Sequence, residues 1–175
     1  MACVTLTKGR KLPCRSGSSG MKAIGIIPFE DGLLELVDGE LETIPASVEK
    51  IYRYELKHTG NTFSEDINTD SDAMSTDFAG TLTVNLQKLD LDLRNEIKEL
   101  TKGSVIIFIE TNFEDKAILV AGSGYGIDLT GGSLQTGGAK TDFNGAVLTF
   151  TSSEIEPIGF LSAEAKTTYA TLIEE

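Results

Sequence analysis

Three segments of the chain alternate between apolar and polar residues: Ile51–His58, Phe78–Leu89 and Gly145–Ser152. In the second, leucine and valine occupy positions 82, 84 and 86, with threonine, asparagine and glutamine between them. In the first, Tyr52, Tyr54 and Leu56 share one face. A period of two is typical of a β-strand with one face buried. Each segment is therefore predicted to be a half-buried strand.

Other apolar segments have strand length but a different pattern. Ser104–Glu110 is apolar on both faces, which predicts a central strand covered on both sides. In Met21–Phe29, Pro28 indicates an edge strand or a strand end. Asp38-Gly39 predicts a hairpin turn between Leu33–Val37 and Glu40–Ile44. Further short strands are predicted at Ala117–Ala121 and around Ile127 and Leu129.

One segment changes to helical spacing. Leu89, Leu93, Ile97 and Leu100 recur through Asp90–Thr101 and predict a helix. Asp90 or Asp92 can cap its start, and Gly103 is expected to end it in the left-handed conformation. Ile158–Ile173 fits a helix by its alanines and glutamates and a strand by its threonines and tyrosine.

These elements define the expected fold. Eight to ten strands with one clear helix, and no repeating βαβ unit, predict a mainly β protein. We expect a β-sandwich or barrel with one α-helix packed across an opening. The body would span residues 21–175, preceded by an extended N-terminal arm, residues 1–20, that ends in RSGSSG.

Residues 60–77 are predicted to form a long loop. They hold five acidic residues, no basic residue and few apolar ones. One interpretation is a solvated surface loop, and the other is an extended loop that reaches an adjacent subunit. Residues 122–145 are rich in glycine and are expected to include a mobile loop with Gly131, Gly132, Gly137 and Gly138 as hinges.

Charge divides the chain into two parts. Residues 1–22 contain five basic residues and no acidic one, whereas the body carries all 27 acidic residues and the chain has a net charge of −12. A basic arm can dock on the acidic surface of a neighbouring copy, and an acidic body repels nucleic acid. This asymmetry indicates self-assembly.

Motifs for catalysis or cofactor binding are incomplete. His58 is the single histidine, so a Ser–His or Cys–His mechanism would have to use it, yet it lies at the exposed end of a strand. Residues 122–126, GSGYG, miss the dinucleotide spacing, and in residues 132–141 two residues separate Gly137 from Lys140 of a phosphate loop. No enzyme activity and no cofactor are expected.

Metal and membrane sites are not indicated either. The acidic cluster Asp66–Asp72 lacks the glycine and glutamate of a calcium loop. Cys3 and Cys14 with one distant histidine do not supply four zinc ligands; free thiols or a short disulfide loop are the alternatives. No apolar run is long enough to span a bilayer, and no signal core precedes the body.

In order and character, two stretches resemble tail and virion proteins of bacteriophages: FAGTLTVNLQKLDLDLRNEIKELTKGSVIIFIETNF and KAILVAGSGYGIDLTGGSLQTGGAKTDFNGAVLTFTSSEIEPIGFL. The start, LTKGRKLPCRSGSSGMKAIGIIPF, also looks like the opening of such proteins. Within this group the chain is most similar to tail tube proteins, which are related in fold to the tube protein of type VI secretion.

The resemblance implies a subunit that forms hexameric rings stacked into a hollow tube. DNA would pass through it without specific binding, the partners would be further copies and other tail proteins, and no membrane would be involved. The protein would be made in the host cytoplasm and end in the virion tail. Phe78–Leu89 and Ser104–Glu110 would belong to sheets that join edge to edge around the ring.

The arm and the 60–77 loop are the candidate contacts between subunits. Their charged and aromatic residues are the proposed interface positions: Lys8, Arg10, Lys11, Arg15, Phe63, Glu65, Asp66, Asp70, Asp72 and Asp77. Two alternatives stay open. The chain could be another virion component, such as a tail terminator, an adaptor or a capsid decoration protein, or it could be a carbohydrate-binding β-sandwich module.

Overall fold

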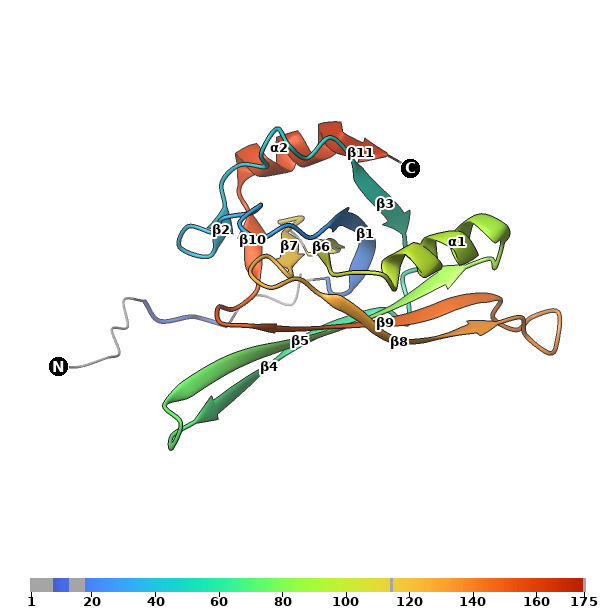
Figure 1. Cartoon of the computed structure of the whole chain (residues 1–175), viewed down its shortest axis with the longest axis horizontal. Coiled ribbons are helices and arrows are strands. Elements are labelled where there is room, and N and C mark those ends of the chain that lie inside the picture. The colour runs from blue at the N-terminus through green and yellow to red at the C-terminus, as the bar shows by residue number, and fades with distance from the viewer. Residues whose placement is uncertain (1–7, 13–17, 114, 175) are drawn as a thin grey trace.

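The computed structural model describes residues 8–12, 18–113 and 115–174. It is mainly β, as the alternating pattern predicts, and contains two sheets and two helices. The sheets are stacked, and the longer strands of one of them extend past the other on both sides (Figure 1).

The larger sheet has seven strands, in the order β11-β3-β1-β6-β7-β10-β2. Its central strands are antiparallel. Each outermost strand pairs in parallel with its neighbour, β11 with β3 and β2 with β10. The bounds are β1 Met21–Pro28, β2 Glu40–Leu41, β3 Ile51–Glu55, β6 Val105–Thr111, β7 Ile118–Ala121, β10 Gly159–Leu161 and β11 Ile173–Glu174. β1 lies inside this sheet, so Pro28 marks a strand end.

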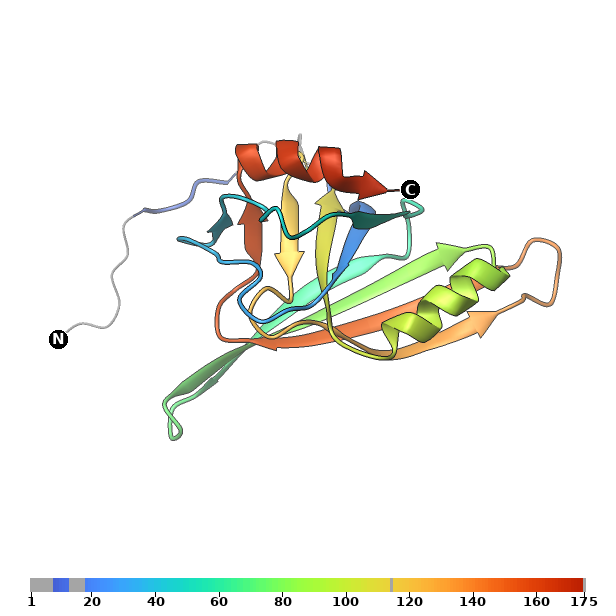
Figure 2. The same cartoon turned by 45° about the horizontal axis from the view of Figure 1, so that its top comes forward.

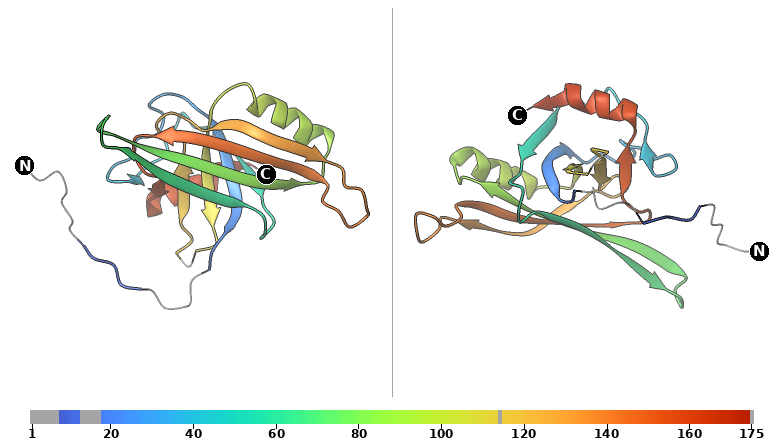
Figure 3. Two further views of the ribbon diagram at one scale, coloured as in Figure 1. Left: turned by 90° about the horizontal axis from the view of Figure 1, so that it is seen from below. Right: turned by 180° about the vertical axis from the view of Figure 1, so that it is seen from behind.

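The smaller sheet is antiparallel and consists of two hairpins, β4–β5 and β8–β9, joined through β5 and β9 in the order β4-β5-β9-β8. Its bounds are β4 Thr62–Asp70, β5 Ser75–Gln87, β8 Asp128–Gln135 and β9 Gly145–Glu154. β5 and β9 pair without interruption from Phe78 opposite Glu154 to Gln87 opposite Gly145. Seen from below, the four strands run side by side in front of the rest of the molecule (Figure 3).

β6 separates two hydrophobic cores. Val105, Ile107 and Ile109 belong to the core between the two sheets. Ile106 and Phe108 belong to a second core on the opposite face of the larger sheet. The prediction of a central strand covered on both sides is confirmed, and the cover comes from the domain itself.

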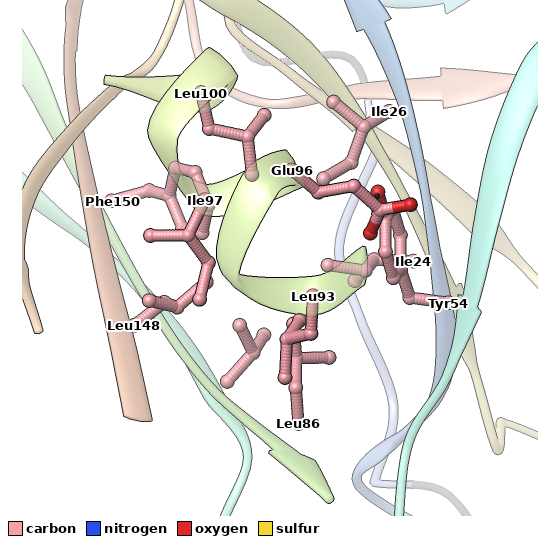
Figure 4. Close-up of a pocket in the computed structure, with 11 residues that line it drawn as sticks. Ile24, Ile26, Tyr54, Leu86, Leu93, Glu96, Ile97, Leu100, Leu148 and Phe150 are labelled. Carbon is pink, nitrogen blue, oxygen red and sulfur yellow. Dashed lines mark hydrogen bonds between the residues drawn. The ribbon is translucent and has the colours of Figure 1, made fainter. Parts of the chain in front are cut away.

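The predicted helix is α1, Leu91–Leu100, and its position across the opening between the sheets is confirmed. Asp90 caps it by accepting a hydrogen bond from the Leu93 backbone N–H. Leu93, Ile97 and Leu100 point from the helix into the core between the sheets (Figure 4). The gap that these side chains share with both sheets has no room for a water molecule.

The second core is covered by α2, Ala163–Leu172, and by the segment 29–50, on the side away from the four-stranded sheet (Figure 2). This helix settles the open choice for Ile158–Ile173 and makes the expectation of one helix incomplete. Its threonine hydroxyls, which favoured a strand, donate to backbone carbonyls of the helix itself, as Thr167 does to Ala163. Only Ala165 and Tyr169 are buried, so its apolar stripe is short.

A buried charged cluster joins α2 to the larger sheet. Glu110 on β6 accepts hydrogen bonds from Arg53 Nε at 2.7 Å and from the Tyr169 hydroxyl at 3.1 Å, with Lys22 Nζ 3.7 Å away. Gly25 makes room for this cluster, because a Cβ there would lie 2.6 Å from the Tyr169 hydroxyl oxygen. Desolvation alone would raise the pKa of Glu110, but the hydrogen bond and charge of Arg53 hold it below its ordinary value.

One predicted loop is wrong, and a second is shorter than predicted, because it contains Gly137 and Gly138 but not Gly131 and Gly132. Residues 60–77 contain β4 and the start of β5, which form a hairpin. Its polar composition hid the strand, because both faces meet solvent towards the tip and apolar alternation is lost there. Gly131 and Gly132 lie in β8 and are not loop hinges, because their backbone pairs with Thr149 and Leu148.

Two local predictions also need correction. α1 ends at Thr101 in a right-handed conformation, and Gly103 does not cap it. Leu33–Val37 is not a strand and meets Glu40–Leu41 only through one bridge, since β2 instead pairs with β10. The turn itself is confirmed: Asp38 and Gly39 both have positive φ.

Replacing Ile107 with aspartate is expected to unfold the body. Its side chain is fully buried between the sheets. The free-energy cost of burying an unpaired charge there would exceed the free energy of unfolding of a typical domain. Circular dichroism and chemical denaturation would measure the loss. Leu91→Asp is the matched control, because Leu91 is 68% exposed in the first turn of α1, where an acid is favourable. Native circular dichroism for Ile107→Asp would contradict the strand assignment.

Replacing Glu110 with glutamine is expected to lower the free energy of unfolding by about 3 kcal/mol at neutral pH, because Arg53 loses its buried carboxylate partner. Since the folded-state pKa of Glu110 is depressed, its contribution is present above the unfolded value of about 4.3 and is lost as the pH falls through the folded value. Urea denaturation should therefore show that the difference in the free energy of unfolding between wild type and variant becomes smaller as the pH is lowered. A gap that is constant with pH would contradict this account.

Candidate assembly surfaces

The outward face of the four-stranded sheet is built mostly from polar side chains, with Ala79 and Val147 as apolar exceptions. The pairing register places Thr83 of β5 between Thr62 of β4 and Thr149 of β9, on the face opposite the core residue Leu82. The remaining members of the face alternate in the same way: Ser64, Asp66, Asn68, Asp77, Ala79, Thr81, Asn85, Asp128, Ser133, Gln135, Val147, Thr151 and Ser153. The hydroxyls of Thr151 and Thr130 are 3.2 Å apart and hydrogen-bonded.

This sheet has no positive charge. None of the residues of β4, β5, β8 and β9, all of which the structure describes, is Lys, Arg or His. The same strands contain six acidic residues: Glu65, Asp66, Asp70, Asp77, Asp128 and Glu154. A sheet of this composition presents a hydrated, negative surface that repels polyanions.

Both edges of this sheet are open. Within the described part of the chain, β4 pairs only with β5, and β8 pairs only with β9. β4 is nine residues long and β8 is eight, longer than the typical strand. Long unpaired edges are sites where another chain can add a strand.

The two hairpins also project beyond the body, at opposite ends of the sheet (Figures 1 and 3). At the tip of β4–β5, the Asp70 carboxylate accepts hydrogen bonds from the backbone N–H groups of Asp72 and Ala73. On the core-facing side of this hairpin, Ile67 is 66% exposed because the sheet has passed the edge of the core. The projecting hairpin therefore carries exposed apolar surface beyond the body of the subunit.

The proposed interface residues fall in three different environments. In the arm, Lys8, Arg10 and Lys11 are exposed, and Arg15 lies outside the described residues. Phe63 packs on the core between the sheets, and Glu65 accepts a hydrogen bond from the Ile158 backbone N–H at 3.0 Å, so the fold itself uses both.

The four aspartates of the hairpin remain at its surface. Asp66 is exposed on the outward face, and Asp77 lies on the same face, where it accepts a hydrogen bond from Ser153. Asp70 and Asp72 form the tip. The open edges of β4 and β8 could not be predicted from the sequence, because pairing between distant segments decides which strands lie at an edge. The absence of basic residues from 61 to 87 indicated only the negative charge of β4 and β5.

The structure also explains the motif-like glycine segments. Residues 122–126 form a turn with positive φ at Gly122 and Gly126, and Glu154 accepts a hydrogen bond from the Tyr125 N–H. In the loop after β8, the backbone N–H groups of Gly138 and Ala139 are held by the Asp142 carboxylate, at 2.9 and 2.7 Å. The donors that a phosphate would need are therefore already occupied by an anion of the chain.

His58 is exposed in the connection between β3 and β4. Among the described residues, no three His, Cys, Asp or Glu side chains are grouped to hold a metal ion. Cys3 and Cys14 lie outside the described residues.

No helix of the described chain is long and apolar enough to cross a membrane.

Comparisons with protein-family models, with curated proteins and with solved structures find no match for this chain.

If the open edge of β4 joins copies of the chain, proline in this strand should block assembly when it replaces a residue whose N–H group faces that edge. Consecutive N–H groups of a strand point to opposite sides, so one of Asn68→Pro and Thr69→Pro removes a donor from the open edge and the other removes one from the β5 side. Both side chains are exposed. The variant that keeps the wild-type circular dichroism should lose concentration-dependent association in sedimentation velocity; unchanged association would contradict edge pairing.

Proposed function

We propose that this protein is a structural subunit of a bacteriophage tail tube, and that it assembles into hexameric rings that stack around a channel for DNA. The observation that carries the proposal is the four-stranded sheet, which combines two open edges with a polar face without basic residues. The resemblance to tail tube proteins in the order of elements supports the same conclusion.

Edge pairing between copies is the assembly step in this proposal. β4 of one subunit adds to β8 of the next, so that each copy contributes four strands to one continuous barrel. Closure of the ring satisfies the unpaired N–H and C=O groups of both edges and leaves no edge for uncontrolled aggregation. An open sheet with two long edges would otherwise be an aggregation hazard.

In the closed barrel, the outward face of each sheet would line the channel. One face of the sheet is committed to the core by Leu82, Val84 and Phe150. Hydroxyl, amide and carboxylate groups would then meet the genome, and DNA is bound mainly through cations that contact its phosphates. A wall without basic residues lets DNA pass without holding it.

The carbohydrate-binding alternative is less well supported by the side chains present. A sugar-binding sheet would expose aromatic rings on one face. The outward face of the four-stranded sheet carries none, and Tyr54 is half-buried with its hydroxyl bonded to Glu96 at 3.0 Å.

Electron microscopy of the purified chain over a range of concentrations tests the proposal. The expected result is rings that stack into tubes with an open channel, without turnover of a substrate. Finite rings that never stack would favour a terminator, an adaptor or another virion component. Monomers at every concentration would overturn the proposal.

A charge variant tests which face lines the channel. Thr83→Lys places a cation at the centre of the outward face, and the assembled variant is expected to retain DNA at low salt and release it at high salt. Thr167→Lys is the matched control, since it makes the same change on the exposed side of α2. Fluorescence anisotropy with labelled DNA measures both, and equal behaviour of the two variants would contradict the assignment of the face.

A further inference from the structure

A groove runs between α1 and the ends of β1 and β3. It has a volume of about 600 Å³, a size typical of ligand sites. Its floor is apolar, with Ile26, Pro28 and Leu100, and Tyr52 stands beside it with half of its surface exposed. The groove is thus an open apolar surface on a chain whose other large apolar residues are mostly in the two cores.

The wall that α1 contributes to the groove is acidic. Glu96 and Glu99 line it and Arg94 and Lys98 of the same helix do not, while Lys102, which follows the helix, also lines the groove beside Glu99. Glu96 accepts a hydrogen bond from the Tyr54 hydroxyl, and Glu99 binds Lys102 at 2.6 Å, an exposed pair of the weak surface type. A basic ligand with an apolar side chain would match this wall and floor.

The described part of the arm has that chemistry. Residues 8–12 read KGRKL, three cations followed by a leucine, and the Leu12 side chain is 97% exposed. The arm joins the body at Met21, the end of β1 opposite to the groove at Pro28. In the views of Figures 1 and 3, residues 8–12 lie on the side of the molecule away from α1.

We propose that residues 8–12 of one copy dock in the α1–β1–β3 groove of a second copy, with Leu12 on the apolar floor and the basic side chains along Glu96 and Glu99. The inference rests on the proposed function, because it requires that copies associate. It assigns to the basic arm a specific acceptor on the next subunit, separate from the sheet edges. Tyr52 also lines the groove, and its aromatic ring is of the kind that attracts a guanidinium or ammonium group.

Site-specific photocrosslinking in the full chain tests the docking. A benzophenone amino acid replaces Leu12, and assemblies are formed from a mixture of isotopically light and heavy chains. Irradiation is expected to join the benzophenone at position 12 to peptides containing residues 26–28, 52–54 or 95–105 of the other isotopic chain. Crosslinks confined to the same chain, or to the strands of the four-stranded sheet, would overturn the proposal.

Charge variants give a second readout. Glu96→Gln with Glu99→Gln should lower the yield of the intermolecular crosslink about fivefold, the effect of losing two exposed ion pairs. Glu42→Gln with Glu164→Gln is the control, with the same charge change at exposed positions away from the groove. Reversal of the groove (Glu96→Lys, Glu99→Lys) should abolish the crosslink, and Lys8→Glu with Arg10→Glu in the same chain should restore it. Equal yields in the groove and control variants would refute the contact.

The failure of this inference differs from the failure of the proposed function. Deletion of residues 1–19 is expected to leave the fold intact and to weaken polymerisation. If the deletion variant forms the same tubes as the full chain, the docking is wrong and the tube subunit stands. If the full chain is monomeric at every concentration, both fall.

Discussion

The uninterrupted pairing of β5 with β9 is the interaction on which the rest of this structure depends. Over this ladder every second residue points into the core between the sheets, among them Leu82, Val84 and Phe150. Because the period is two, the intervening residues must all lie on the opposite face. A single register therefore fixes both the core and the polar face proposed to line a channel, and a slip of one residue would exchange them.

The length of these strands has a further consequence. β5 is thirteen residues long, more than the larger sheet can cover, so its N-terminal end projects with β4 as a hairpin, and the β8–β9 hairpin projects at the opposite end of the sheet. Where the hairpin has passed the core, an apolar side chain such as Ile67 of β4 is left largely exposed. In a monomer this arrangement is a hazard, and in the proposed ring it is the means of assembly.

The rest of the fold serves to hold this sheet rigid. β6 buries both faces and so connects the core under the four-stranded sheet with the core under α2. Glu110, Arg53 and Tyr169 tie α2 to the opposite face of the larger sheet, and α1 closes the open side between the sheets.

The sequence by itself determined the elements whose burial repeats with a fixed period: the alternating strands, the doubly buried β6, and α1 with its Asp90 cap. It also determined the separation of a basic arm from an acidic body. The tertiary structure alone decided that the polar 60–77 segment is half of a hairpin, because its stability comes from β5 and not from its own composition. It likewise decided that α2 is a helix, that the free edges are β4 and β8, and that the acidic side of α1 borders an apolar groove, since each depends on neighbours distant along the chain.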